Sequence, residues 1–426
     1  METKGYANQS LPGSNFQVAC TVAMKTGHSF YSCLWRRLAP LMVSLPFALI
    51  TTCLQASQPV SLLSGHPAGH APDAFTRPVI TTPVLNLQAA AQLEDIIPEL
   101  VGKRVVLVAE THDRYEHHLT QLEIIRRLHA LNPRLVIGME AFQQPYQAVL
   151  DDYIEGRLDE QALLRDTEYY RRWKFDFRHY EPILAFAREH RLPVVALNLP
   201  VELTDRVSRV GIEGLTETER GQIPAAIDHS DTAYAERLRA VYESHPAVDG
   251  RGFDGFLEVQ LAWDEGMAER AADYLAAHPG TNMVLLAGTG HLAYGSGIPQ
   301  RLQRRLQDDI AIILNNWSGP LEPGLADYLL MPQEQTLPPS GKFGALLDEQ
   351  EDRLLIDHCL ADSPCQQAGL RSGDRILSIN GEPVNDMADL RLVTWNLMPG
   401  ERVTLEVERR RWFRRAQALS HEIVLY

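Results

Sequence analysis

The segment Arg104-Val105-Val106-Leu107-Val108-Ala109, at residues 104–109, decides the fold, because it is a short and continuous apolar run rich in valine. Four similar runs follow, and longer segments with helical spacing separate them: Leu135–Met139, Pro193–Leu197, Met283–Ala287 and Ile310–Leu314. Continuous apolar strands that alternate with helices are typical of a parallel sheet covered on both faces. The sequence therefore predicts an α/β domain, a parallel sheet flanked by helices. Residues 155–254 hold more helix than one crossover needs and predict an extra helical subdomain.

The segments that flank this unit differ from it in composition. Residues 57–83 are rich in Pro, Ser, Gly and His without periodicity and predict a linker, and a Pro/Gly-rich passage predicts a second linker at 319–341. The α/β domain is therefore expected at residues 84–318. Residues 342–426 read as short strands with turn signals such as Asn380-Gly381, and predict a small β-rich domain.

The first 56 residues are interpreted as a signal or anchor segment. Arg36 and Arg37 precede an apolar run, 38–52, that is too short to span a bilayer comfortably. Cys53 follows at the position of a lipidated cysteine, while cleavage near Ala56 and a retained anchor are the alternatives, and the sequence leaves all three open. We expect export, with the protein anchored to the membrane or free on the periplasmic side of the bacterial envelope.

Net charge and cysteine usage limit the classes of partner and of stabilising bond. The formal net charge of −15 argues against nucleic-acid binding, which normally needs a basic face. The five cysteines show no spacing that identifies a disulfide framework or a zinc cluster. Cys359 and Cys365 could form a bridge if the protein is exported, but we favour two unpaired core residues.

Polar side chains follow the apolar runs. Glu110 and His112 come after the first run, Glu140 ends the second, and His291 follows the fourth. Because the carboxyl ends of parallel strands lie along one edge of a sheet, we expect these side chains to meet. Carboxylates and imidazoles hold divalent metal ions and also act as acids and bases. The pattern therefore predicts a shared site, with all four as catalytic residues or with His112, Glu140 and His291 as metal ligands.

Three further polar residues are expected to support this site. Gln260 and Asp264 interrupt the apolar stripe of a helix predicted around residues 256–275, and Asn198 ends the third run. Buried polar groups require partners, so these residues either bind neighbouring loops or orient the site histidines. The stretch 169–180 contains tyrosines, arginines and a histidine. Tyrosine and histidine ligate haem iron, and arginine binds haem propionates. The alternative interpretation of this stretch is an amphipathic lid with ordinary packing.

A set of motifs lies between about Val105 and Asn315: Glu110-Thr111-His112, Gly138-Met139-Glu140, Trp173 through Tyr180-Glu181-Pro182, Ala196-Leu197-Asn198-Leu199-Pro200, Gln260 with Asp264 and Met267, and Gly288-Thr289-Gly290-His291. Through these motifs the segment resembles the ChaN-like haem-uptake lipoproteins, which belong to a superfamily with the Tiki metalloproteases, TraB-like proteins and erythromycin esterases. The family implies an iron-uptake protein that binds haem with Tyr180 on the iron and a histidine from a dimer mate. Further haem-binding residues are expected at His179, His112 and His291.

The wider superfamily implies a rival function, a divalent-metal-dependent hydrolase or protease. In that case His112, Glu140 and His291 hold the metal ion, and a metal-bound water attacks a carbonyl with Glu110 or Glu140 as the base.

The C-terminal segment resembles a PDZ domain of the bacterial HtrA type. The matching motifs are Ser363-Pro364-Cys365-Gln366-Gln367-Ala368-Gly369-Leu370, Gly373-Asp374-Arg375-Ile376 and Ile379-Asn380-Gly381. The resemblance implies a loop that binds the terminal carboxylate of a peptide, while the peptide pairs along the next strand. That loop consists of Lys342, Phe343, Gly344 and Ala345. The expected partner is a C-terminal or extended peptide of another envelope protein.

Overall fold

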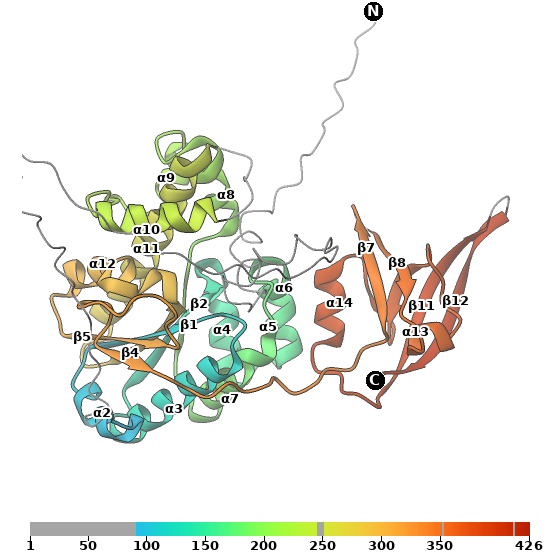
Figure 1. Ribbon diagram of the computed structural model, residues 1–426, viewed down its shortest axis with the longest axis horizontal. Coiled ribbons are helices and arrows are strands. Elements are labelled where there is room, and N and C mark those ends of the chain that lie inside the picture. The colour runs from blue at the N-terminus through green and yellow to red at the C-terminus, as the bar shows by residue number, and fades with distance from the viewer. Residues whose placement is uncertain (1–90, 245–250, 352, 412–413) are drawn as a thin grey trace, which may run out of the picture. The chain divides into compact units, whose positions relative to one another are not determined.

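A computed structural model of the chain describes residues 91–244, 251–351, 353–411 and 414–426. The predicted export segment, with Cys53, and the first predicted linker lie outside the described residues. Residues 91–426 fall within one compact unit that contains two separate sheets (Figure 1). In the described ranges, no helix combines the length and the apolar composition needed to cross a bilayer.

The first sheet is built from alternating strands and helices, as the apolar runs predict. Its elements, in chain order, are α2 (Leu93–Leu100), β1 (Val105–Glu110), α3 (Tyr115–Leu131), β2 (Leu135–Gln143), η2 (Gln144–Tyr146), α4 (Gln147–Ile154), α5 (Glu160–Asp166), α6 (Tyr169–Arg172), η3 (Phe177–His179), α7 (Glu181–His190), β3 (Val194–Asn198), α8 (Val201–Val210), α9 (Glu217–Arg220), α10 (Thr232–Glu243), α11 (Gly252–Ala277), β4 (Asn282–Gly288), η4 (Thr289–His291), η5 (Ala293–Gly295), α12 (Ile298–Leu306), β5 (Ile310–Asn315) and β6 (Tyr328–Leu330).

The six strands lie in the order β3-β2-β4-β1-β5-β6, and every neighbouring pair is parallel. The predicted α/β architecture is therefore confirmed. Strand β6 belongs to this sheet although it lies within the segment 319–341 that we expected to be a linker. The irregular connection to the second sheet is accordingly shorter than the composition suggested, because three residues, Tyr328–Leu330, pair with the edge strand β5.

Alternate residues of each strand pack into two different cores. In β1, Val106 and Val108 belong to one core, whereas Val105, Leu107 and Ala109 belong to the other. The first core also takes in side chains of α2 to α7, and the second takes in side chains of α11 and α12. The sheet is thus buried on both faces, which explains why its strands are continuously apolar.

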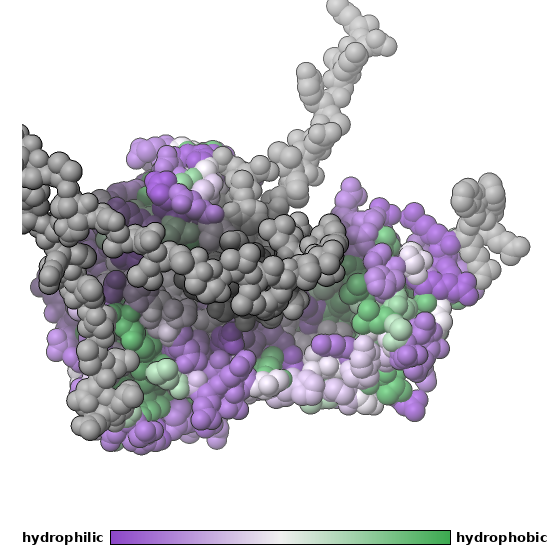
Figure 2. Space-filling view, viewed as in Figure 1, coloured by the Kyte–Doolittle hydropathy of each residue, from purple (hydrophilic) through white to green (hydrophobic). Residues whose placement is uncertain are grey.

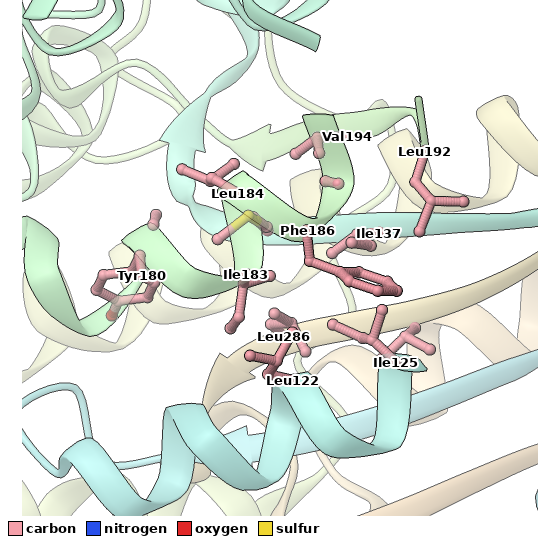
Figure 3. Packing of buried hydrophobic residues seen from close by; sticks show 14 of the residues in the cluster. Leu122, Ile125, Ile137, Tyr180, Ile183, Leu184, Phe186, Leu192, Val194 and Leu286 are labelled. Atoms are coloured by element: carbon pink, nitrogen blue, oxygen red, sulfur yellow. The ribbon is translucent and has the colours of Figure 1, made fainter. Parts of the chain in front are cut away.

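The first core is closed mainly by α3 and α7. Figure 3 shows Leu122 and Ile125 of α3 facing Ile183 and Phe186 of α7, with Leu286 of β4 beside them. This packing holds the amino-terminal ends of the two helices against the carboxyl end of β1, which is where the polar residues lie.

The extra helices predicted for residues 155–254 are present. Helices α8, α9 and α10 follow β3, and α8 and α10 pack on the long helix α11. They form two small apolar clusters apart from the main cores, one around Leu203 and Val207 and the other around Tyr234 and Phe256. These helices therefore extend the domain on the α11 side of the sheet.

The second sheet is formed by the C-terminal residues. Its strands follow the order β12-β11-β9-β8-β7, with the short β10 paired to β9, and all its pairs are antiparallel. The elements are β7 (Ala345–Gln350), β8 (Arg353–Cys359), α13 (Pro364–Gln367), β9 (Arg375–Ile379), β10 (Glu382–Pro383), α14 (Met387–Thr394), β11 (Arg402–Arg411) and β12 (Arg414–Val424). Hydrophobic residues reach the surface over β7 and β8 (Figure 2), where Leu346 and Leu360 are exposed.

The two C-terminal cysteines form a disulfide, which corrects our expectation that they are unpaired. The Cα atoms of Cys359 and Cys365 lie 5.5 Å apart, within the range that a disulfide spans. Their bond closes the turn between β8 and α13. Sequence spacing alone did not reveal it, because the pairing depends on how this turn folds back.

A pair of substitutions on α3 tests the core. Ile125 is fully buried between α3 and α7, whereas Leu131, at the end of the same helix, is 60% exposed. We expect Ile125→Ala to lower the free energy of unfolding by about 2–5 kcal/mol, because it leaves a cavity. Leu131→Ala should change it by less than about 0.5 kcal/mol. Urea denaturation measures both, and equal effects would contradict this packing.

Candidate functional site

The polar residues predicted from the strand ends meet on three adjacent strands. The sheet order places β4 between β2 and β1, so that Glu140, Gly288 and Glu110 come from neighbouring strands. The Nε2 atom of His291 lies 3.5 Å from Oε1 of Glu140. The structure thus brings Glu110, His112, Glu140 and His291 to one edge of the sheet, although they are up to 181 residues apart.

Glu110 is the most heavily bonded of these groups. One of its oxygens accepts hydrogen bonds from Nδ1 of His112, at 2.8 Å, and from the hydroxyl of Tyr180, at 2.6 Å. The other accepts from the Gln121 amide at 2.9 Å and lies 3.2 Å from Nδ1 of His118. Burial by itself would raise the pKa of Glu110, but the nearby His118 and the hydrogen bonds from both histidines hold it well below its usual range.

His291 is held in a similar way from the other side. Its Nδ1 donates to Oδ1 of Asp264 at 2.7 Å, and Oδ2 of Asp264 accepts from the Tyr234 hydroxyl at 2.8 Å. Asp264 is fully buried on α11, so it presents a fixed acceptor to the imidazole. A buried carboxylate on one ring nitrogen fixes the tautomer and the orientation of a histidine and leaves the other nitrogen for a ligand.

Gly288 makes the approach of His112 and Glu140 possible. Its backbone N–H donates to Oε2 of Glu140 at 2.7 Å. A Cβ atom at this position would lie 3.0 Å from Cε1 and 3.2 Å from Nε2 of His112, and 3.6 Å from the Glu140 carboxylate. Glycine therefore leaves the space between the imidazole of His112 and the carboxylate of Glu140.

The two histidines bind protons more tightly than usual. Burial lowers the pKa of an imidazole, but in His112 the hydrogen bond to Glu110 and the charge of Glu140 outweigh that effect and raise it. In His291 the charges of Glu140 and Asp264 outweigh burial and raise the pKa to about 9. At neutral pH the imidazole of His291 is accordingly positively charged when no ligand is bound.

Aromatic rings flank His112. The ring centroids of Trp173 and Phe175 lie 4.8 Å and 4.7 Å from that of His112. Nε2 of His112 has no hydrogen bond to any of the described residues, while 14% of its side chain is exposed. The site therefore offers an oriented imidazole nitrogen beside apolar rings.

The remaining predicted residues lie in different positions. Tyr180 is buried with its hydroxyl on Glu110, and this burial together with the Glu110 charge raises its pKa well above the usual value. His179 stacks beside His118 and does not reach His291 or Glu140. Asn198 donates to the backbone oxygen of Glu140. Gln260 lies one turn before Asp264, with no hydrogen bond to His112 or His291 in the described part of the chain.

Sequence reasoning missed His118, Gln121 and Tyr234. His118 and Gln121 replace apolar residues on the buried stripe of α3 that continues through Ile125. Polar residues at such positions require buried partners, which was an available signal. The sequence around Tyr234 gives no such signal. Its hydroxyl contacts Asp264 only because α10 packs on α11, and no local pattern predicts that packing.

The predicted carboxylate-binding loop, residues 342–345, follows the first sheet in the sequence and leads into β7. Gly344 adopts a φ of +72°, and a Cβ there would lie 2.5 Å from Cβ of Ser363, so only glycine fits. The backbone N–H groups of Phe343 and Gly344 donate no hydrogen bond within the described residues. The backbone N–H of Lys342, in contrast, donates to the Tyr426 oxygen, and the Tyr426 N–H donates to the Lys342 oxygen.

A search of the described residues for three or more His, Cys, Asp or Glu side chains arranged to hold a metal ion finds no such group. The predicted divalent-metal site therefore stays a prediction.

Two curated proteins illustrate what the chain is similar to. It is 26% identical over 225 residues to Protein RETICULATA-RELATED 5, chloroplastic, of Arabidopsis thaliana, over 49% of this chain and 30% of that protein. It is 30% identical over 131 residues to a probable periplasmic serine endoprotease DegP-like of Chlamydia muridarum, over 30% of this chain and 24% of that protein. The chain thus spans less than a third of the length of either relative.

Solved structures show weaker likeness. ChaN of Campylobacter jejuni, solved with cofacial haem, aligns at 20% identity and a TM-score of 0.46, over 57% of this chain and 92% of that chain. The erythromycin esterase EreC in its open conformation aligns at 17% identity and a TM-score of 0.33, over 52% and 72%.

The assignment of the chain rests on two family models. Residues 96–302 match the model described as haem-binding uptake, Tiki superfamily, ChaN, and residues 341–416 match that of the PDZ domain. Both resemblances inferred from the motifs are thereby confirmed. Residues 96–302 thus form a ChaN-like haem-binding domain of the Tiki superfamily, and the C-terminal residues 341–416 form a PDZ domain.

Proposed function

We propose that the protein is an exported haem-binding protein of the bacterial envelope, related to iron uptake, which docks on a peptide through its PDZ domain. The observation that carries the proposal is the state of His112. Its Nδ1 is held by Glu110, and its Nε2, which has no hydrogen-bond partner among the described residues, lies beside the Trp173 and Phe175 rings.

The residues at this site fit haem chemically. An imidazole nitrogen is an axial ligand of haem iron, and aromatic rings pack against a porphyrin face. When bound, haem would supply an iron centre, while Glu110 keeps the His112 ring oriented.

We rank His112 above Tyr180 as the iron ligand, which reverses the order inferred from the family. Tyr180 is 1% exposed, and its phenol already donates to Glu110. A tyrosinate ligand would have to give up this hydrogen bond and lose its proton against a raised pKa. His112 keeps its Glu110 partner and needs no rearrangement of the fold, and its Nε2 would give up a proton when it binds iron. A homodimer, in which a mate supplies a second ligand, stays a prediction.

Hemin titration tests the ligand. We expect wild-type protein to give a Soret band, His112→Ala to weaken hemin binding at least about tenfold, and Tyr180→Phe to leave the band largely intact, since an axial ligand supplies much of the iron affinity. His278→Ala, which removes an exposed histidine at the end of α11, is the matched control. If only Tyr180→Phe loses the Soret band, the iron ligand is Tyr180 and not His112. If wild-type protein takes up no hemin, the haem-binding proposal is wrong.

A hydrolase is the second candidate, favoured by the Asp264–His291–Glu140 arrangement. An imidazole oriented by one carboxylate and facing another is suited to moving protons at a bound ester or peptide. In the predicted form of this enzyme, a divalent metal ion at His112, Glu140 and His291 would supply a nucleophilic water.

Substitution of His291 separates the two candidates. If the protein hydrolyses esters or peptides, His291→Asn should lower kcat by about a hundredfold or more, because proton transfer by a placed side chain contributes at least that much. The assay uses p-nitrophenyl acetate and casein with and without added Zn²⁺ or Mn²⁺. Hemin binding without metal-stimulated hydrolysis in wild type would leave only the haem function.

The raised pKa of His291 predicts how stability varies with pH. Its value of about 9 in the folded protein exceeds the value near 6.5 of an unfolded chain. The stabilisation is therefore complete below about pH 6.5 and is lost as the pH rises through 9. Relative to His291→Asn, wild type should lose on the order of 2–3 kcal/mol between pH 6 and pH 10, measured by urea denaturation. A pH-independent difference would contradict the ion pairs with Glu140 and Asp264.

Two observations support export. Disulfides such as Cys359–Cys365 persist in oxidising compartments and are rare in the bacterial cytosol. The DegP-like relatives are named as periplasmic proteins. Whether Cys53 is lipidated or the segment is cleaved stays as open as the sequence left it.

The PDZ domain supplies the docking function in this proposal. The N–H groups of Phe343 and Gly344, which donate to no other described residue, are suited to a terminal carboxylate. Strand β7, which lies at the end of its described sheet, is suited to pairing with an extended peptide. The partner would be a C-terminal or extended peptide of another envelope protein.

A further inference from the structure

A cavity of about 520 Å³ lies against the PDZ peptide groove. One wall consists of the carboxylate-binding loop and groove residues such as Leu347 and Leu390, and the other comes from the ChaN-like domain, through residues 174–179. The peptide groove is therefore not lined by the PDZ domain alone.

The PDZ side of this cavity has the features of a site for a peptide end. Strand β7 pairs only with β8, so its outer edge is free within the described sheet. Beside it the floor is apolar, with Ile379, Leu390 and Val403 buried. An extended peptide with an apolar last residue would pair along β7 and place its carboxylate at the Phe343 and Gly344 N–H groups.

Helix α14, which borders the groove, is packed between two cores. Ala388, Leu392 and Trp395 pack against the first core of the ChaN-like domain, whereas Leu390 belongs to the PDZ core. Residues on opposite sides of this short helix thus pack in the cores of different domains. Helix α14 therefore connects the groove to the helices α5 and α6.

Hydrogen bonds fix the same contact. Arg171 of α6 donates to both Asp386 and Asp389, at 2.7 Å each, and Arg391 of α14 donates to the backbone oxygen of Lys174 at 2.7 Å. The segment that follows α6 is therefore held at the groove by bonds to α14 itself.

Three groups on the ChaN-like side of this cavity have no hydrogen-bond or ion-pair partner among the described residues. Lys174 is half-buried, and no carboxylate of the described residues lies within ion-pair distance of its ammonium group. Nδ1 of His179 and Oδ1 of Asp113 are buried and make no hydrogen bond within the described ranges, and His179 is only 6% exposed. All three residues line the cavity. Unsatisfied buried polar groups are costly, so Lys174 and Nδ1 of His179 point to a ligand that supplies an acceptor, whereas Oδ1 of Asp113 requires a donor.

Of these three groups, the ammonium group of Lys174 would be stabilised most by a ligand of opposite charge. Burial lowers the pKa of this amine, and the charges of Asp205 and Glu349 act against that effect without outweighing it. A carboxylate that entered the cavity would compensate this desolvation and form a charge-assisted hydrogen bond.

We propose that residues 174–179 form the second wall of the peptide site, and that Lys174 selects peptides carrying an acidic side chain near their C-terminus. The terminal carboxylate would be bound by the PDZ loop and the side-chain carboxylate by Lys174. This inference rests on the peptide docking proposed above and names the class of peptide that is docked.

Fluorescence polarisation with labelled peptides tests the inference on the full chain. The probes are Gly/Ser decapeptides that end in valine, with a single Glu at one of the four positions before it, and matched probes with Gln there. We expect wild type to bind at least one Glu probe about five- to tenfold more tightly than its Gln counterpart. Lys174→Gln should bind both equally, at the affinity of the Gln probe.

Two control variants make the outcome specific. Lys103→Gln removes the same charge from the segment before β1 and should keep the preference for Glu. Gly344→Val, which strains the carboxylate-binding loop, should weaken all probes alike. Unfolding midpoints of the variants confirm that each one is folded.

Failure of the inference differs from failure of docking. Equal binding of Glu and Gln probes by wild type, or a Glu preference that survives Lys174→Gln, would overturn the role of Lys174 and leave the PDZ site intact. If no probe binds, or if C-terminally amidated probes bind as well as free acids, peptide docking itself is wrong and this inference falls with it.

Discussion

The carboxylate of Glu110 is the interaction on which the site depends. It accepts hydrogen bonds from His112, Gln121 and Tyr180 and lies beside His118, so it joins β1 to α3 and to the start of α7. A buried carboxylate is tolerated only when its charge is compensated in this way. Glu110 therefore holds the two helices that close the first core against the strand end and orients the imidazole of His112.

The opposite half of the site repeats this arrangement with different residues. Asp264 orients His291 from α11, as Glu110 orients His112 from β1. Between the halves lies β4, whose Gly288 removes the one side chain that would separate His112 from Glu140. Two oriented imidazoles around one carboxylate suit both axial ligation and proton transfer, which is why the haem and hydrolase readings share their residues and differ in the role of each.

The segment from Trp173 to His179 borders both sites of the molecule. Trp173 and Phe175 flank His112, while Lys174 and His179 line the peptide groove. Lys174 has a φ of +67°, a turn of the backbone between its two aromatic neighbours. Consecutive side chains thus serve different sites, because this segment runs between the sheet edge and the α14 helix that it contacts through Arg171 and Arg391.

The sequence by itself determined the alternation of strands and helices, the β-rich C-terminal domain and the meeting of Glu110, His112, Glu140 and His291. These follow from local periodicity and from the rule that parallel strands end at one edge. Only the tertiary structure decided the partners. The burial of Tyr180 on Glu110, the gap at Gly288, the Cys359–Cys365 bond and the second wall of the groove join segments that no local pattern relates. They depend on the strand order and the helix packing, and these result from all the contacts of the core together rather than from any one segment.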